Sequence, residues 1–223
     1  MRTAIVLFAR SPEREAAEKR MRFAAPLFRA LVASWLDAAR CHGATPVVAC
    51  AAADRDALAS IAPDIEREWI EQRGATFGER AARASADAFA RGFDAIVLAA
   101  IDAPPRDLRE IFASLERGIP AISPSRDGGI NCIGLVAPEA ELLAQFTPRR
   151  RDLVQLCRRY FARLAIVAGT IDVDNERALA IAKRDRAWRA FLSQTPPAQP
   201  RNRATAQPGH AIQSASRGPP VNV

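Results

Sequence analysis

Short apolar runs alternate along the chain with longer segments in which apolar residues recur every three or four positions. The runs predict buried strands, because a strand covered on both faces of a parallel sheet is apolar at nearly every position. The longer segments predict helices with one apolar face. Strands are expected at residues 3–9, 45–51, 94–100, 119–123, 130–136 and 164–169, and a more charged run at 66–72 suits an edge strand.

Helices are expected between these strands. They would cover residues 23–43, a short segment from Asp54, and then 76–92, 105–117, 139–145, 150–163 and 176–192, while 11–20 is expected to be a polar loop. The short link 127–129 between two apolar runs predicts a sharp reversal of the chain. Strands that alternate with helices predict an α/β fold with a mostly parallel, doubly wound sheet, whose ligand crevice lies at the carboxyl ends of the strands.

The composition favours one domain followed by a polar tail. With 223 residues, 49% of them hydrophobic, the chain is long enough for one well-buried core. Residues 195–223 are rich in Pro, Ala, Gln and Ser and have no apolar period, so we expect a domain at 1–194 and a disordered extension after it. Three tail arginines carry part of the formal charge of +7, which leaves a mildly basic domain and makes a nucleic-acid partner unlikely.

The chain has no apolar run long enough for a membrane span or a signal peptide, so the sequence predicts a cytoplasmic protein without a membrane partner. Its four cysteines include no C-x-x-C pair, and only two histidines accompany them. These residues would supply a zinc site poorly, and the cysteines are expected to be reduced and mostly buried.

Three polar segments directly follow predicted strands, namely 10–20, 102–104 and 127–129. An aspartate just past a buried strand can hold a divalent cation, whose coordination phosphate oxygens normally complete. Asp102 is the first candidate, and its alternative role is to cap the helix that follows.

Further carboxylates and cations could join Asp102 in the crevice. Asp172 and Asp174 follow a late strand and could reach the same ion, although Asp174 or Asn175 could instead cap the last helix. Cations in the loop after the first strand, among them Arg10, Lys19 and Arg20, could contact a di- or triphosphate, or could pair with the glutamates Glu13, Glu15 and Glu18 among them. Gly128 and Gly129 would let the backbone approach a ligand, or would only permit the turn.

Taken in order, these segments resemble the DUF2064 family of bacterial glycosyltransferase-A-like proteins. That family includes arsenosugar biosynthesis glycosyltransferases and is distantly related to the molybdenum-cofactor guanylyltransferases. Its motifs are matched here by Phe8, Ala9, Arg10, Pro12, Arg20 and Met21; by Gln72, Gly74, Gly78, Glu79 and Arg80; by Asp102 and Pro104; by Asp127, Gly128, Gly129, Gly134 and Leu135; and by Asp172, Val173 and Asp174. The chain has Glu15 where the family has glycine, and Glu18-Lys19 where the family has lysine and threonine.

The resemblance implies a three-layer α/β/α nucleotide-diphospho-sugar transferase fold, of the Rossmann-like glycosyltransferase-A type. It also implies transfer of a glycosyl group from a nucleotide sugar to a small acceptor. Asp102 and Asp127 would be catalytic, and Asp102 would hold Mg²⁺ or Mn²⁺ with Asp172 or Asp174 as further ligands. The implied substrate-binding residues are Phe8, Ala9, Arg10, Lys19, Arg20, Arg80, Pro104, Gly128 and Gly129.

Two other functions are open at this point. The first is nucleotidyl transfer from a nucleoside triphosphate to a phosphorylated small molecule, for which the same crevice would serve. The second is a non-catalytic nucleotide-binding or scaffold protein, which the glutamates at 15 and 18 favour because they place negative charge in a loop that would face phosphate.

Overall fold

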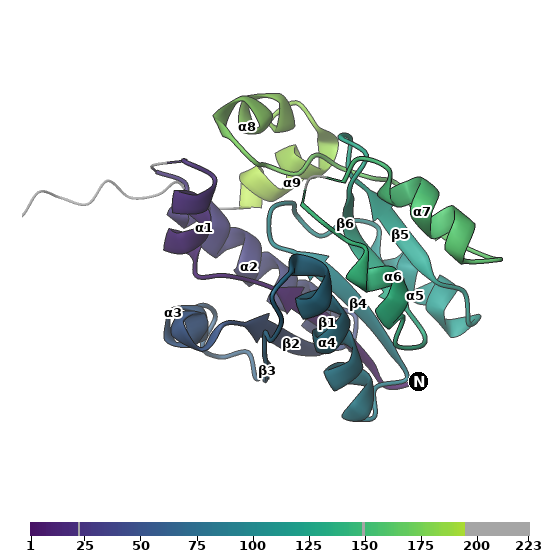
Figure 1. Cartoon of the computed structure of the whole chain (residues 1–223). Coiled ribbons are helices and arrows are strands. Elements are labelled where there is room, and N and C mark those ends of the chain that lie inside the picture. The colour runs from purple at the N-terminus through teal and green to yellow at the C-terminus, as the bar shows by residue number, and fades with distance from the viewer. Residues whose placement is uncertain (22, 149, 195–223) are drawn as a thin grey trace, which may run out of the picture.

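The computed structural model describes residues 1–21, 23–148 and 150–194, so the extension expected at 195–223 lies outside the described residues. Within this part of the chain a seven-stranded sheet runs through the centre, in the order β3-β2-β1-β4-β6-β5-β7 (Figure 1). The strands are β1 (Thr3–Phe8), β2 (Thr45–Cys50), β3 (Glu68–Glu71), β4 (Ala95–Ala100), β5 (Ala121–Pro124), β6 (Ile130–Leu135) and β7 (Ala165–Ile166).

The sheet is parallel except at β6, which pairs antiparallel with both β4 and β5. The reversal predicted at 127–129 is therefore confirmed, and so is the edge position of β3. The chain passes from β1 outward to β2 and β3 and then returns to β4 on the other side of β1. In sheets of this kind the change of direction opens a crevice at the carboxyl ends of the two central strands, here at Phe8 and Ala100.

Helices cover both faces of the sheet, which confirms the three-layer α/β/α arrangement. On one face α2 (Ala25–Cys41), α3 (Arg55–Ala59) and α5 (Leu108–Glu116) contribute to an apolar cluster that includes Ile5 and Leu7 of β1. On the other, α4 (Phe77–Ala90), α6 (Ala140–Ala144) and α7 (Leu153–Tyr160) contribute to a second cluster that includes Ala4 and Val6. The alternation along β1 follows from the strand geometry, which points successive side chains to opposite faces.

A third apolar cluster lies beyond the carboxyl ends of the strands, where α1 (Pro12–Glu18), α8 (Glu176–Ala182) and α9 (Arg186–Gln194) gather near the start of α2 (Figure 1). The prediction of a loop at 11–20 is thus wrong for most of that segment, because Pro12–Glu18 is helical. Pro12 occupies the first turn, where its missing N–H costs nothing, and Ala16 is buried against the cluster.

The prediction of a single helix at 176–192 is also wrong, because this segment contains two helices, α8 and α9. Asp185 separates them: its Oδ1 accepts hydrogen bonds from the backbone N–H groups of Ala187 at 2.9 Å and Trp188 at 3.4 Å, and thereby caps α9. Similarly, α5 begins at Leu108 rather than 105, since Asp107 before it has a left-handed φ of 51°. Among the described residues, none of the helices combines the length and the apolar character needed to cross a membrane.

Candidate functional site

Three aspartates from two distant segments meet at the crevice. One carboxylate oxygen from each of Asp102, Asp172 and Asp174 lies within 4.8 Å of the others. Asp102 follows β4 directly, and Asp172 and Asp174 lie in the segment between β7 and α8. That segment crosses the ends of the strands: Thr170 N–H donates to Pro124 O at 3.2 Å, and Val173 N–H donates to Asp102 O at 2.9 Å.

Neither Asp102 nor Asp174 caps the helix that follows it. The N-terminus of α5 is at Asp107, five residues after Asp102. Asn175 caps α8, where its side chain accepts a hydrogen bond from Ala178 N–H at 2.8 Å. Asp102 and Asp174 therefore direct their carboxylates toward the crevice and its ion pairs rather than toward a helix terminus.

Two buried tryptophans hold the acidic segments in place from behind. The indole N–H of Trp188 in α9 donates to Ile171 O at 2.7 Å, and that of Trp35 in α2 donates to Ala103 O at 2.8 Å. Both rings are almost completely buried. Each indole thus fixes the backbone beside an aspartate of the site.

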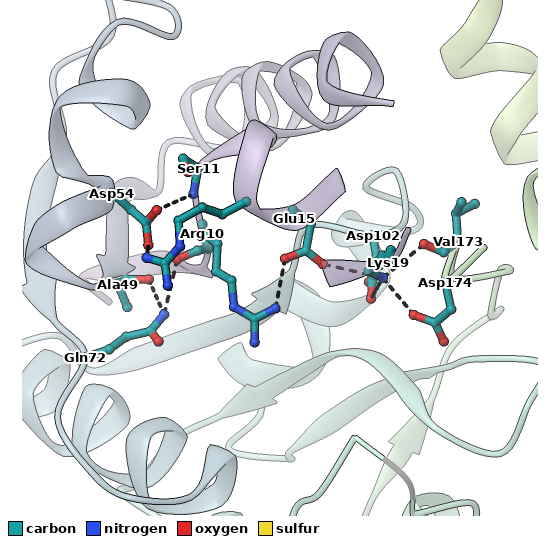
Figure 2. Close-up of polar contacts among 12 residues, drawn as sticks. Arg10, Ser11, Glu15, Lys19, Ala49, Asp54, Gln72, Asp102, Val173 and Asp174 are labelled. Atoms are coloured by element: carbon teal, nitrogen blue, oxygen red, sulfur yellow. Dashed lines mark hydrogen bonds and ion pairs between the residues drawn. The ribbon is translucent and has the colours of Figure 1, made fainter. Parts of the chain in front are cut away.

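Lys19, at the end of α1, inserts its ammonium among these carboxylates (Figure 2). Its Nζ lies 2.7 Å from Asp174 Oδ1, 3.0 Å from Asp102 Oδ2 and 2.9 Å from the Val173 carbonyl oxygen. Burial disfavours the charged amine, but the carboxylates of Asp102 and Asp174 outweigh that effect and raise the pKa of Lys19.

Glu15 lies on the other side of Lys19 and is also buried. Its Oε1 is 3.5 Å from Lys19 Nζ, and its Oε2 is 3.4 Å from Arg10 Nη1. Burial raises the pKa of Glu15, an effect that the Lys19 charge partly offsets. The glutamate that replaces the family's glycine is therefore paired with cations of its own segment.

Asp172 is the half-buried third member of the cluster. Its carboxylate accepts a hydrogen bond from the Ser125 hydroxyl, which follows β5. Burial raises the pKa of Asp172, and the neighbouring Asp102 carboxylate adds to the shift.

Two hollows adjoin at the carboxylates. The polar hollow, about 230 Å³, is lined by Phe8, Ala9, Arg10, Glu15, Glu18, Lys19, Gln72, Phe77, Arg80, Ala100, Ile101, Asp102, Pro148 and Asp174. The apolar hollow, about 170 Å³, extends along β4 and β6 and is lined by residues that include Leu98, Ile130, Ile133, Phe146, Leu153, Asp127 and Asp172. Phe8, Phe77, Asp102 and Asp174 border both.

Most residues predicted for the site do converge here. The hollows are lined by Phe8, Ala9, Arg10, Lys19, Arg80, Asp102, Asp127, Gly129, Asp172 and Asp174. Arg20 is exposed and lies outside both hollows, at a left-handed φ of 55°. Pro104 is buried beside a separate groove between α2 and α9.

The contacts of the Asp127-Gly128-Gly129 link are those of a tight turn. Asp127 accepts a hydrogen bond from Gly129 N–H at 3.0 Å and forms an ion pair with Arg151. Gly128 has a φ of 92°, and a side chain there would collide with the backbone of Arg151. The turn itself therefore requires glycine at 128, while Gly129 and Asp127 face the apolar hollow.

Some residues of the site were missed from the sequence. Phe77 stands between the hollows, with its ring 5.1 Å from that of Phe8 in an edge-to-face contact. Gln72 lines the polar hollow and donates to Ala49 O at 2.7 Å, joining the end of β3 to that of β2. Gln72 belongs to a matched motif and could have been chosen from it, whereas Phe77 and Ser125 carried no sequence signal.

The donor set fits a small divalent cation. Three carboxylates with closely spaced oxygens are the ligands that Mg²⁺ and Mn²⁺ prefer, and the Val173 carbonyl oxygen lies beside them. Asp102 and Asp174 also form ion pairs with the Lys19 ammonium.

The fold is that of the nucleotide-diphospho-sugar transferases. A protein of Desulfovibrio desulfuricans G20 that is inferred to be such a transferase superposes with a TM-score of 0.69 at 22% identity, over 86% of this chain and 95% of the other. The 4-diphosphocytidyl-2C-methyl-D-erythritol synthase of Anaerococcus prevotii DSM 20548 has a TM-score of 0.55 at 11% identity, over 86% and 99% of the two chains. A manganese complex of Rv0371c from Mycobacterium tuberculosis H37Rv has a TM-score of 0.51 at 17% identity, over 86% and 98%.

The sequence also matches DUF2064, a family of uncharacterized proteins conserved in bacteria, over residues 34–147. This match spans more than half of the chain, and the chain belongs to that family. No curated protein matches it.

Proposed function

We propose that the chain transfers a glycosyl group from a nucleotide sugar to a small acceptor, with Mg²⁺ or Mn²⁺ on the donor diphosphate. The observation that carries this proposal is the meeting of three carboxylates where a polar and an apolar hollow adjoin. A donor in the polar hollow and an acceptor in the apolar hollow would face each other across Asp102 and Asp174.

The charged residues of the site would have separate roles in this reaction. Asp102, Asp172 and Asp174 would hold the divalent ion, which when bound supplies positive charge to the diphosphate. Arg10 and Arg80 line the polar hollow and can donate charge-assisted hydrogen bonds to phosphate oxygens.

The transfer breaks the bond between the anomeric carbon and the diphosphate oxygen, and the nucleoside diphosphate leaves with the electron pair. The acceptor oxygen bonds to the anomeric carbon and loses its proton. Asp127, the carboxylate of the apolar hollow outside the proposed ion site, would accept that proton.

The test is thermal unfolding of the protein with nucleotide sugars, with and without Mn²⁺. A donor present at about 100 times its Kd should stabilise the native state by about 2.7 kcal/mol, and only when Mn²⁺ is present. Asp102→Asn should abolish the Mn²⁺-dependent shift, while Asp64→Asn, the same change at an exposed position, should leave it intact. Equal shifts for Asp102→Asn and wild type would overturn the proposal.

Nucleotidyl transfer is the second candidate, and the similarity to a synthase whose product carries a diphosphocytidyl group favours it. The same carboxylates would then hold the ion on a nucleoside triphosphate. Release of pyrophosphate from a triphosphate, instead of nucleoside diphosphate from a nucleotide sugar, distinguishes this reaction from glycosyl transfer.

A further inference from the structure

Lys19 occupies the position that a cation bound by Asp102 and Asp174 would need. Its Nζ has three oxygen partners within 3.0 Å, two of them carboxylate oxygens of the acidic cluster and one the Val173 carbonyl. The side chain is only 10% exposed, so water screens these contacts little. A divalent ion at the same oxygens would meet a positive charge at contact distance.

Glu15 offers the ammonium a second place close by. It lies one helical turn before Lys19, its Oε1 is 3.5 Å from Nζ, and its side chain is also 10% exposed. Asp102 and Asp174 are on one side of the ammonium and Glu15 is on the other (Figure 2). A small rotation of the lysine side chain would therefore exchange the aspartates for the glutamate without exposing an unpaired buried charge.

The charges of the cluster agree with such an exchange. The site holds four carboxylates, from Glu15, Asp102, Asp172 and Asp174, and two cations that pair with them, Lys19 and Arg10. Two negative charges remain uncompensated in this count, and one divalent ion would balance them while Lys19 stays in the site.

We propose that Lys19 is a built-in counter-ion that competes with the divalent cation for Asp102 and Asp174, and that Glu15 receives its ammonium when the cation binds. The inference rests on the proposed function, because it takes these aspartates as the cation site. In this proposal Glu15, which replaces the family's glycine, is the alternative partner of the Lys19 ammonium.

The first experiment measures binding of Mn²⁺ alone, by calorimetry, to Lys19→Met and to Lys183→Met. The chain has two lysines, and Lys183 is exposed at the end of α8, which makes it a matched control. Lys19→Met should bind Mn²⁺ about tenfold more tightly than wild type, as expected if Lys19 occupies the carboxylates roughly nine-tenths of the time. Lys183→Met should stay within about twofold.

The second experiment tests Glu15 by a double-mutant cycle. Glu15→Gln should weaken Mn²⁺ binding in the wild-type background, because Lys19 then lacks its alternative partner. In the Lys19→Met background the same change should have at most about a twofold effect. Equal effects in both backgrounds would mean that Glu15 acts through its own charge and would remove it from the proposal.

A third measurement uses the unaltered protein, in case Lys19→Met does not fold. Acetylation of lysine amines by an N-hydroxysuccinimide ester, followed by mass spectrometry, should be faster at Lys19 when Mn²⁺ is present, with Lys183 as the internal reference. An unchanged Lys19 rate at saturating Mn²⁺ would overturn the proposal.

The outcomes separate the two proposals. Failure of both wild type and Lys19→Met to bind Mn²⁺ would overturn the ion site of the proposed function and this inference together. Binding to wild type that Asp102→Asn abolishes, but that Lys19→Met leaves unchanged or weakens, would overturn the competition alone.

Discussion

At the scale of single residues, one fully buried carboxylate positions the segment that carries Lys19. Asp54, at the turn after β2, accepts a hydrogen bond from Ser11 N–H at 3.1 Å and forms an ion pair with Arg14 at 2.7 Å. Ser11 has no side-chain cap on α1, so Asp54 supplies the acceptor that the start of this helix needs. The side chain of Asp54 thus joins β2 to the first helix of the site.

Asp54→Ala should lower the free energy of unfolding by about 2 to 3 kcal/mol, because it leaves the buried Ser11 N–H without an acceptor. Asp56→Ala, an exposed change two residues further on in the first turn of α3, should cost within about 0.5 kcal/mol. Urea unfolding of both variants measures the difference. Similar losses for the two would show that the Ser11 and Arg14 contacts contribute little.

At the scale of elements, helices behind the crevice determine where the acidic segments lie. The last helix of the described residues, α9, packs Trp188 against the cluster formed with α1 and α2, and its indole N–H donates to the carbonyl of Ile171. Asp185 adds a second tie, since its Oδ1 also accepts from the Thr170 hydroxyl at 3.1 Å. Asp185, at the break between α8 and α9, therefore helps to position the segment that carries Asp172 and Asp174.

Trp188→Phe should destabilise the protein by about 1 to 3 kcal/mol, through the lost indole hydrogen bond and the cavity that the smaller ring leaves. It should also weaken Mn²⁺ binding, because the backbone next to Asp172 loses its support. Trp69→Phe is the control: Trp69 lies partly exposed on the edge strand β3, next to Arg55. Unfolding and Mn²⁺ titration should show little change for this control. Unchanged Mn²⁺ binding in Trp188→Phe would contradict the idea that the Trp188 indole supports the backbone next to Asp172.

At the scale of the whole molecule, two apolar clusters lie on opposite faces of one sheet. Cys50 in β2 and Cys132 in β6 belong to one cluster, and Cys157 in α7 belongs to the other. Burial raises the pKa of these thiols, to about 11, about 12 and about 11 respectively. The expectation of a single domain at 1–194 implies that both faces unfold together.

At pH 8 a thiol reagent should label Cys41, which is exposed, and leave the three buried cysteines unlabelled. Their raised pKa values keep them as thiols, and packing excludes the reagent. With increasing urea the three should become reactive at one midpoint, equal to that of the helical circular dichroism signal. A lower midpoint for Cys157 alone would show that the face covered by α4, α6 and α7 unfolds separately.

The fold class could be predicted from the sequence because apolar periodicity reflects burial directly. A continuous apolar run such as Ile5–Leu7 is stable only between two layers, and the polar residues after each run then lie at one edge of the sheet. This placement is why Asp102, Asp172 and Asp174 could be chosen together before any coordinates.

What only the tertiary structure decided are the contacts between residues far apart in the chain. Local patterns did not predict that 12–18 is a helix, that 176–192 is broken by Asp185, or that Asp54 supports Ser11. Lys19 and Asp174 are 155 positions apart, and no local signal states whether a lysine points to solvent, to phosphate or to a carboxylate. Sequence determines which residues must be buried and which elements can bury them. Packing of the complete chain determines which charges then face one another, because a buried charge must find its partner wherever the fold places one.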